Sequence, residues 1–116
     1  MTSQPSGIAA EELAARYLAA QGLRVIARNY RCRFGEVDLI AQDGDTLVFV
    51  EVRLRRSNRF GGALASITHA KQRKLIATAR CYLASLRRVP QCRFDAIVLD
   101  ALDPARIEWL RDIIAE

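Results

Sequence analysis

Two segments of the chain carry apolar residues at helical spacing. The first lies between Ser6, a residue type that often caps a helix, and Gly22, which suits a helix C-terminus. Its apolar stripe comprises Ala10, Leu13, Ala14, Tyr17 and Leu18. The second is predicted to begin after the cap residue Thr68 and to end near Leu86. Its apolar face comprises Leu75, Ile76, Ala79, Leu83 and Leu86.

The remaining segments with hydrophobic patterning are short and read as strands. They are residues 23–27, 36–42, 46–55, 94–99 and 105–110, with a turn at Asp103-Pro104 before the last one. The order α-β-β-β-α-β-β predicts an α/β fold with a mixed sheet flanked by helices. Because the sequence has no repeat and no linker, we expect one domain over residues 1–116, with residues 1–6 as a flexible tail.

The dipeptide Asp43-Gly44 predicts a tight hairpin between the second and third strands. With these two residues at the centre of the turn, Gln42 pairs with Asp45. Glu36 then lies opposite Glu51, and Asp38 lies opposite Phe49. Directly paired residues share a face of the sheet, and side chains alternate along each strand.

This register separates an apolar face from an acidic one. The apolar face comprises Val37, Leu39, Ala41, Val48, Val50, Val52 and Leu54. The other face carries Glu36, Asp38, Glu51 and Arg53. A slip of one residue in the pairing would place apolar and charged side chains on the same face. The wholly apolar face therefore supports the assignment of residues to the two faces.

Three carboxylates on one patch of a sheet repel one another and need a compensating charge. A divalent cation is one candidate, because Mg²⁺ binds carboxylate oxygens together with substrate phosphate. Arg53, on the same face, is another. The plain alternative is a solvated face on which Glu36, Asp38 and Glu51 pair with arginines. The apolar surroundings of Glu51 favour the metal site, since an acid in a central strand is costly without a partner.

Composition excludes some classes of protein. Of the 116 residues, 51% are hydrophobic and 27% are charged, as in an ordinary globular domain. No segment approaches the roughly 20 apolar residues of a membrane span, and the N-terminus lacks the pattern of a signal peptide. The cysteines Cys32, Cys81 and Cys92 are odd in number and lack C-x-x-C spacing, which indicates a reducing cytoplasm.

The charge balance favours a phosphate-rich partner. The chain has 18 basic and 13 acidic residues, for a net charge of +5, and sixteen of the basic residues are arginine. Guanidinium groups bind phosphate through a rigid fork of donors. The genome's base composition explains the excess of arginine equally well, so charge alone does not establish nucleic-acid binding.

The hairpin resembles a known signature. Gly35-Glu36-Val37-Asp38-Leu39-Ile40 followed by Val48-Phe49-Val50-Glu51-Val52-Arg53-Leu54-Arg55 is similar to the GEIDLI…VFVEVKxR signature of the YraN-like family of predicted nucleases. The resemblance extends from about Glu11 to Leu99. It includes Arg28-Asn29-Tyr30, Phe60-Gly61, Lys71 and Arg93-Phe94-Asp95.

That family is in turn similar to the restriction-endonuclease-like PD-(D/E)XK superfamily, which includes Holliday junction resolvases. The resemblance implies that Asp38 and Glu51 bind the metal, Mg²⁺ or Mn²⁺. It also places Arg53 where the superfamily has lysine. Arginine stays charged in proteins and cannot act as a base. Arg53 could still orient water or stabilise charge in the transition state, or the site is catalytically weak.

Several other residues are candidates for the site. Glu11 flanks the apolar stripe of the first helix and could be a further metal ligand, or simply an acid favoured by the helix dipole. Gln72 could orient water, or bond to the backbone. Lys71 could contact phosphate, or lie on the surface, where we also expect His69. Asp95 is expected at a strand edge, paired with Arg93 or Arg28, without a role in chemistry.

A basic segment directly follows the acidic strand. Its candidate nucleic-acid contacts are Arg55, Arg56, Arg59 and Phe60. Arginines here would make binding salt-dependent, and the phenylalanine could stack on a base. The alternative is a solvated loop whose phenylalanine packs on the core.

These observations lead to three hypotheses. The first is a metal-dependent endonuclease that hydrolyses phosphodiester bonds in DNA, with branched DNA as one candidate substrate. The second is an inactive nucleic-acid-binding module of the same fold, and the third is a structural domain whose acids pair with arginines. Few residues remain for base readout, so sequence-specific cleavage is not expected. A branched substrate would favour a homodimer, which no sequence feature proves.

Overall fold

The helices and strands follow the predicted order. A computed structural model describes residues 5–54 and 67–114, with side chains from residue 7 onward. The elements are α1 (Pro5–Ala20), β1 (Arg24–Cys32), β2 (Gly35–Asp43), β3 (Thr46–Leu54), α2 (His69–Leu83), β4 (Gln91–Leu99), the 3-10 turn η3 (Pro104–Arg106) and β5 (Ile107–Leu110).

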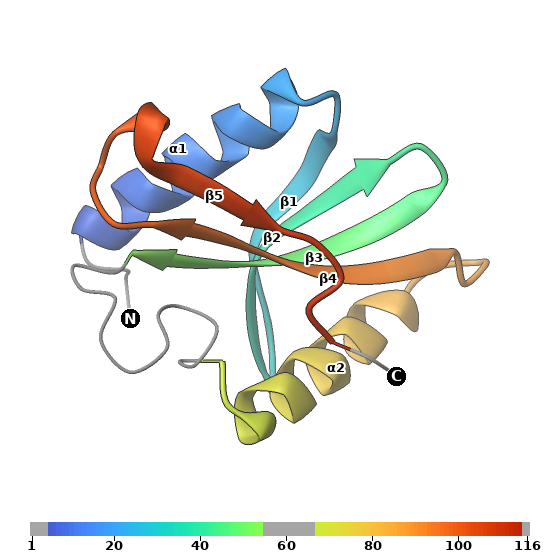
Figure 1. Ribbon diagram of the computed structural model, residues 1–116. Coiled ribbons are helices and arrows are strands. Elements are labelled where there is room, and N and C mark those ends of the chain that lie inside the picture. Colours follow the sequence, from blue (N-terminus) through green and yellow to red (C-terminus); the bar gives the residue numbers. More distant parts are fainter. Residues whose placement is uncertain (1–4, 55–66, 115–116) are drawn as a thin grey trace.

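The five strands form one mixed sheet in the order β1-β2-β3-β4-β5. β3 and β4 are parallel, and the other neighbouring strands are antiparallel. The parallel pair needs a crossover, which α2 supplies. Figure 1 shows α1 on one face of the sheet and α2 on the other. The predicted α/β fold class, with a sheet flanked by helices, is therefore confirmed.

Each face of the sheet has its own apolar cluster. On the α1 face the buried members are Ala10, Ala14, Ala15, Leu18, Leu23, Leu39, Ala41, Val48, Val50, Ile97 and Leu99. On the α2 face they are Val37, Ile40, Leu47, Phe49, Ile67, Leu75, Ala79, Phe94, Ala96 and Ile114. Since β2, β3 and β4 contribute to both clusters, their acidic side chains lie in a sheet that is covered on two sides.

The helix ends match the sequence signals only in part. Thr68 caps α2, as predicted, by accepting the N–H of Lys71 at 3.2 Å. α2 ends at Leu83, three residues before the predicted Leu86. α1 begins at Pro5, so Ser6 lies inside the helix instead of capping it. In the described part of the chain, neither helix is both long and apolar enough to cross a membrane.

The predicted register of the β2–β3 hairpin is wrong by two residues. Asp43 pairs with Thr46, and the ladder continues to the pair Leu39–Val50. The turn residues are therefore Gly44 and Asp45, and Gly44 has a φ of +60°. A glycine with positive φ at the first central position is typical of a type II′ turn, whereas the prediction placed Asp43 and Gly44 at the centre of the turn. Because side chains alternate with a period of two residues, a shift of two leaves each side chain of the two strands on the same face of the hairpin.

The ribbon formed by β1 and β2 bends where it leaves β3. Asn29 in β1 has a φ of +53°, a left-handed conformation that asparagine tolerates better than most residues. Beyond this level Val37 packs on the α2 face, together with Ile40, whereas Leu39 packs on the α1 face. The prediction that Val37 shares a face with Leu39 is therefore wrong. The far end of the ribbon reaches α2 (Figure 1).

Candidate functional site

Asp38 lies at the point where β2 separates from β3. The ladder between the two strands stops at Leu39–Val50, and the next N–H of β3 on that side belongs to Val52. The Oδ2 atom of Asp38 accepts this N–H at 2.7 Å. The carboxyl group therefore replaces a backbone acceptor, and its position is fixed by the end of the ladder.

Glu51 lies beside Asp38, with the two carboxyl groups in hydrogen-bond contact. The shifted register explains this contact, because extending it by one step from Leu39–Val50 brings Asp38 level with Glu51. Arg53 forms an ion pair with Glu51, with 2.6 Å between Nη2 and Oε2, and the side chains of Arg53 and Glu51 are only 24% and 14% exposed. The predicted pairing of Glu36 with Glu51 and of Asp38 with Phe49 is thus replaced by an Asp38–Glu51 pair.

Both carboxyl groups hold a proton more tightly than an ordinary acid does. Burial, followed by the charge of Glu51, raises the pKa of Asp38 to about 8. Burial also raises the pKa of Glu51, although Arg53 and the hydrogen bond with Asp38 oppose the shift. Within the described residues Asp38 forms no ion pair with Lys or Arg, whereas Glu51 has Arg53. Asp38, with a pKa of about 8, is therefore the acid of the pair that keeps its proton more readily.

The other two predicted acidic ligands, Glu36 and Glu11, surround this pair. Glu36 forms an ion pair with Arg31 at 3.0 Å, and both side chains are over a third exposed. The charges of Glu11 and Glu36 add to the raised pKa of Asp38, so both lie within electrostatic range of it. Glu11 and Glu36 therefore act on Asp38 through their charge, whereas Asp38 and Glu51 are in direct contact.

Lys71, from the first turn of α2, contributes positive charge to the site. Its charge lowers the pKa of Glu51, against the effect of burial, and the residue itself is exposed. His69, two residues earlier, is exposed as expected.

Gln72 bonds to the backbone, which was one of its two predicted roles. Its Nε2 atom donates to the backbone carbonyl of Ile67 at 3.3 Å. The side chain is half-buried, and this bond ties the start of α2 to the residue that precedes the helix cap. The role of Gln72 in orienting water stays a prediction.

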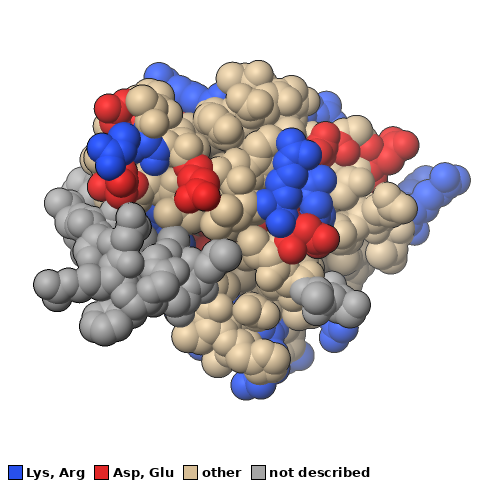
Figure 2. Space-filling view, in the orientation of Figure 1, with Lys and Arg blue, Asp and Glu red and all other residues tan. Residues whose placement is uncertain are grey.

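The predicted basic segment lies outside the described residues. It contains the candidate contacts Arg55, Arg56, Arg59 and Phe60. Elsewhere, Figure 2 shows basic and acidic side chains interspersed on a largely uncharged face, with no continuous basic patch among the described residues on view.

The donor set suits a hard cation with few protein ligands. Asp38 and Glu51 together present carboxylate oxygens whose ionisation is disfavoured by burial. A divalent cation would favour the ionised form of both acids and remove the repulsion between them. The described residues contain no group of three or more acidic, His or Cys side chains placed to hold one ion. Two carboxylates fit Mg²⁺, which completes its shell with water and phosphate, better than Zn²⁺ or Ca²⁺.

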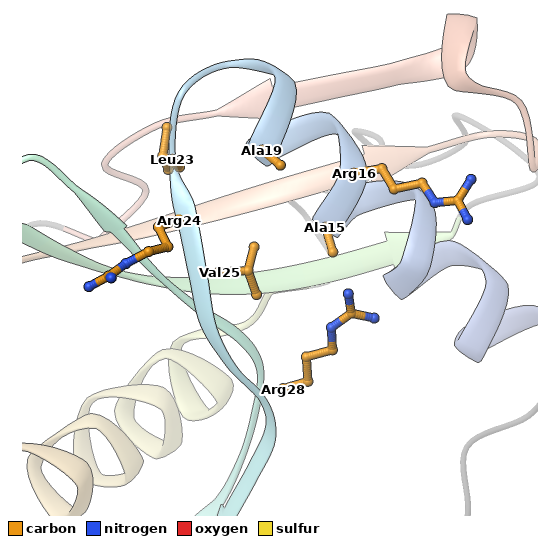
Figure 3. Close-up of a pocket in the computed structure, with 7 residues that line it drawn as sticks. All are labelled: Ala15, Arg16, Ala19, Leu23, Arg24, Val25 and Arg28. Atoms are coloured by element: carbon orange, nitrogen blue, oxygen red, sulfur yellow. The ribbon is translucent and has the colours of Figure 1, made fainter.

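Sequence reasoning missed a second group of cations, between α1 and β1. A pocket of about 330 Å³ is lined by Ala15, Arg16, Ala19, Leu23, Arg24, Val25 and Arg28. Figure 3 shows Arg16 and Arg28 on one side of it, while Arg24 points away. Both Arg16 and Arg28 bind Glu12 at 2.7 Å, and these bonds, that of Arg28 first, lower the pKa of Glu12. The alternation of Arg24 and Arg28 with apolar residues on an edge strand was the available signal.

Asp95 is more deeply buried than the sequence indicated. It was expected at a strand edge, but it lies in β4, inside the sheet, and is 0% exposed. Its carboxylate forms an ion pair with Arg93 at 2.9 Å, and Arg93 was one of the two predicted partners. It also accepts the indole N–H of Trp109 and the backbone N–H of Asp112, both at 2.9 Å. Asp95 therefore joins β4 to the C-terminal segment.

Comparison with known proteins places the chain in a family. Residues 10–99 match the model described as "Uncharacterised protein family UPF0102". The UPF0102 protein of Nitrosospira multiformis is 54% identical over 112 residues, covering 97% of this chain and 94% of the relative. That of Methylobacillus flagellatus is 59% identical over 103 residues, covering 89% and 90%. That of Psychromonas ingrahamii is 57% identical over 114 residues, covering 98% and 93%. The chain therefore belongs to the UPF0102, or YraN-like, family.

Proposed function

We propose that this protein is a metal-dependent nuclease that hydrolyses phosphodiester bonds in DNA. The observation that carries the proposal is the buried contact between Asp38 and Glu51, two acids whose pKa values are both raised. Such a pair is unfavourable for folding, because each acid disfavours ionisation of the other. Perturbed acids of this kind cluster at functional sites. A family resemblance to the PD-(D/E)XK superfamily favours the same assignment.

The surrounding residues have roles that fit this chemistry. Asp38 and Glu51 would hold Mg²⁺ or Mn²⁺, which would supply Lewis-acid charge to the phosphate and to the attacking water. Arg53 is held by Glu51, and its Nε atom is buried without an acceptor in the described part of the chain. A non-bridging phosphate oxygen would satisfy this donor. Lys71 would add a second positive charge beside the same phosphate.

A second candidate is a nucleic-acid-binding module without turnover. The close ion pair between Arg53 and Glu51 favours it, because the guanidinium neutralises one of the two metal ligands. Arg53 also cannot lose a proton to activate water. In this case DNA would bind to Lys71 and the basic groups near the site, and the acid pair would be structural. For either candidate we propose a reducing cytoplasm as the location, which the three free thiols support.

The two candidates differ in one assay. We expect the purified protein to cleave labelled four-way-junction, flap or linear duplex DNA with Mn²⁺ or Mg²⁺, and to stop cleaving in excess EDTA. Asp38→Asn and Glu51→Gln should each lower the cleavage rate by at least about 100-fold, the usual effect of removing one group that stabilises transition-state charge. The rate is measured from single-turnover time courses on denaturing gels.

Glu108→Gln is the matched control, since Glu108 is an exposed acid on β5. This variant should cleave DNA at the wild-type rate. Absence of cleavage with both metals on all substrates, together with salt-sensitive binding, would favour the second candidate. If the protein neither cleaves nor binds DNA, both candidates are wrong.

Binding itself gives a further prediction. Lys71→Gln should weaken DNA binding severalfold and reduce the slope of log Kd against log salt concentration by about 1, because one phosphate contact is lost. Fluorescence anisotropy at several salt concentrations measures both quantities. Lys74→Gln is the control, because Lys74 is also exposed on α2 but is not among the groups with the largest effects on the pKa of Asp38 or Glu51. Equal slopes for the two variants would remove Lys71 from the interface.

A further inference from the structure

Two of the three cysteines meet where the far end of the β1–β2 ribbon packs on α2. Cys32 is the last residue of β1, and Cys81 lies near the end of α2. They are 49 residues apart in sequence, yet their thiols lie close enough for each to shift the pKa of the other. Both are free and half-buried. The contact therefore joins two elements through a pair of reduced sulfur atoms.

The packing around this pair is close. Gly35, the partner of Cys32 in the β1–β2 ladder, has no room for a side chain, since a Cβ atom there would lie 3.1 Å from Oγ1 of Thr78. Tyr30 and Tyr82 pack edge to face, with 5.2 Å between ring centroids. These contacts hold the ribbon against α2 on either side of the cysteines, so the two thiols stay together.

The two thiols have different environments. The backbone N–H of Phe34 donates to Sγ of Cys32 at 3.4 Å. Burial acts to raise the pKa of Cys32, but this N–H and the thiol of Cys81 outweigh it and leave the pKa below the ordinary value. Contact with Cys32 raises the pKa of Cys81. Cys32 is therefore the more easily ionised thiol of the pair, and the thiolate is the form that reacts.

We propose that Cys32 and Cys81 form a reversible intramolecular disulfide when the protein is exposed to a peroxide. The Cys32 thiolate attacks one peroxide oxygen, the O–O bond breaks, and Cys32 becomes a sulfenic acid as water leaves after protonation. The sulfur of Cys81 then attacks the sulfenic sulfur, its proton leaves with the hydroxyl group as a second water, and the S–S bond forms. Two thiols and one hydrogen peroxide thus give one disulfide and two waters.

Cys92 takes no part in this chemistry. It is exposed at the start of β4, where its thiol donates to the carbonyl of Pro90 at 3.4 Å. Its backbone neighbour in the sheet is Leu47, on β3. Cys92 therefore provides an internal reference for the reactivity of an ordinary surface thiol.

The test is a thiol count with a peptide map. The reduced full-length protein is treated with a small excess of hydrogen peroxide and then alkylated. We expect titratable thiols to fall from three to one, the intact mass to fall by that of two hydrogen atoms, and a non-reducing peptide map to link Cys32 to Cys81. Dithiothreitol should restore all three thiols.

Variants assign the order of reaction. Cys92→Ser should form the disulfide at the wild-type rate. Cys81→Ser should instead accumulate a sulfenic acid at Cys32 that reacts with dimedone, whereas Cys32→Ser should give neither product. A linkage through Cys92, a faster reaction at Cys92 than at Cys32, or oxidation of the wild type without any disulfide would overturn the proposal. The wild-type map decides the matter even where a variant fails to fold, and none of these outcomes depends on the proposed nuclease activity.

Discussion

Replacing Asp95 with alanine lowers the free energy of unfolding by about 3–5 kcal/mol. The carboxylate is fully buried and binds the guanidinium of Arg93, the indole of Trp109 and the N–H of Asp112. Without it, three donors in the sheet lose their acceptor, and one of them carries a charge. Arg93 retains Asp43 at 3.3 Å, which holds the expected loss near the lower end of this range. Urea denaturation followed by circular dichroism measures the change.

A matched control separates burial from hydrogen bonding. Asp103 also accepts a backbone N–H, that of Ala105, at 2.9 Å, but it is exposed. Asp103→Ala should therefore cost no more than about 1 kcal/mol, as for a capping residue. If Asp95→Ala costs as little as Asp103→Ala, the Asp95 network does not stabilise the fold in the way described here.

The stability of the protein should fall as the pH rises from about 4 to about 8, through Asp38. The pKa of Asp38 is about 8 in the folded chain, against a reference value of 3.8. Between these values the folded state keeps a proton that the unfolded chain has released, so the free energy of unfolding decreases by up to about 1.4 kcal/mol per pH unit. The contribution is fully present below pH 4 and is lost once the pH exceeds 8.

The variant Asp38→Asn isolates this contribution. Asparagine cannot ionise, yet its side-chain oxygen can still accept the N–H of Val52. Its stability relative to wild type should therefore rise with pH, and it should be the more stable protein at pH 8. Asp45→Asn, in the exposed turn, should show no such trend. Denaturation at pH 5 and pH 8 gives the comparison, and parallel changes in both variants would contradict the assignment of the proton to Asp38.

Addition of Mg²⁺ should reverse the loss at high pH if the proposed function is right. A ligand that binds only the folded state stabilises it, and the cation competes with the proton of Asp38. Wild type should gain stability at pH 8 and Asp38→Asn should not.

The fold and the central pair of acids could be predicted from local patterns. Alternation within 36–42 and 46–55 placed Asp38 and Glu51 on a common side, and an error of two residues in register left that conclusion intact. The error gave Asp38 the wrong cross-strand partner, Phe49 in place of Glu51. It arose because the sequence Asp43-Gly44-Asp45 permits glycine at either central position of the turn. The pattern of hydrophobic residues repeats every two residues, so it cannot distinguish these registers.

The remaining misjudgements have a nonlocal origin. Asp95 was expected at an edge, since an aspartate in a strand is normally solvated. Its burial depends on Arg93 and Trp109, and Trp109 reaches it from β5 only after the chain has turned back. Val37 lies on the opposite face from Leu39, and at the same level of the ribbon Asn29 in the neighbouring strand has a positive φ. The contact between Cys32 and Cys81 likewise exists only once α2 has packed on the ribbon.

Asp38 also satisfies a backbone donor of β3 that β2 no longer reaches, since its side chain accepts the N–H of Val52. The position therefore answers to two selective pressures that can act separately. A relative that abandons catalysis still needs an acceptor here, and asparagine would serve. An aspartate retained at this position is accordingly weak evidence that a relative is an active enzyme, whereas its joint retention with an acid at position 51 is the informative signal.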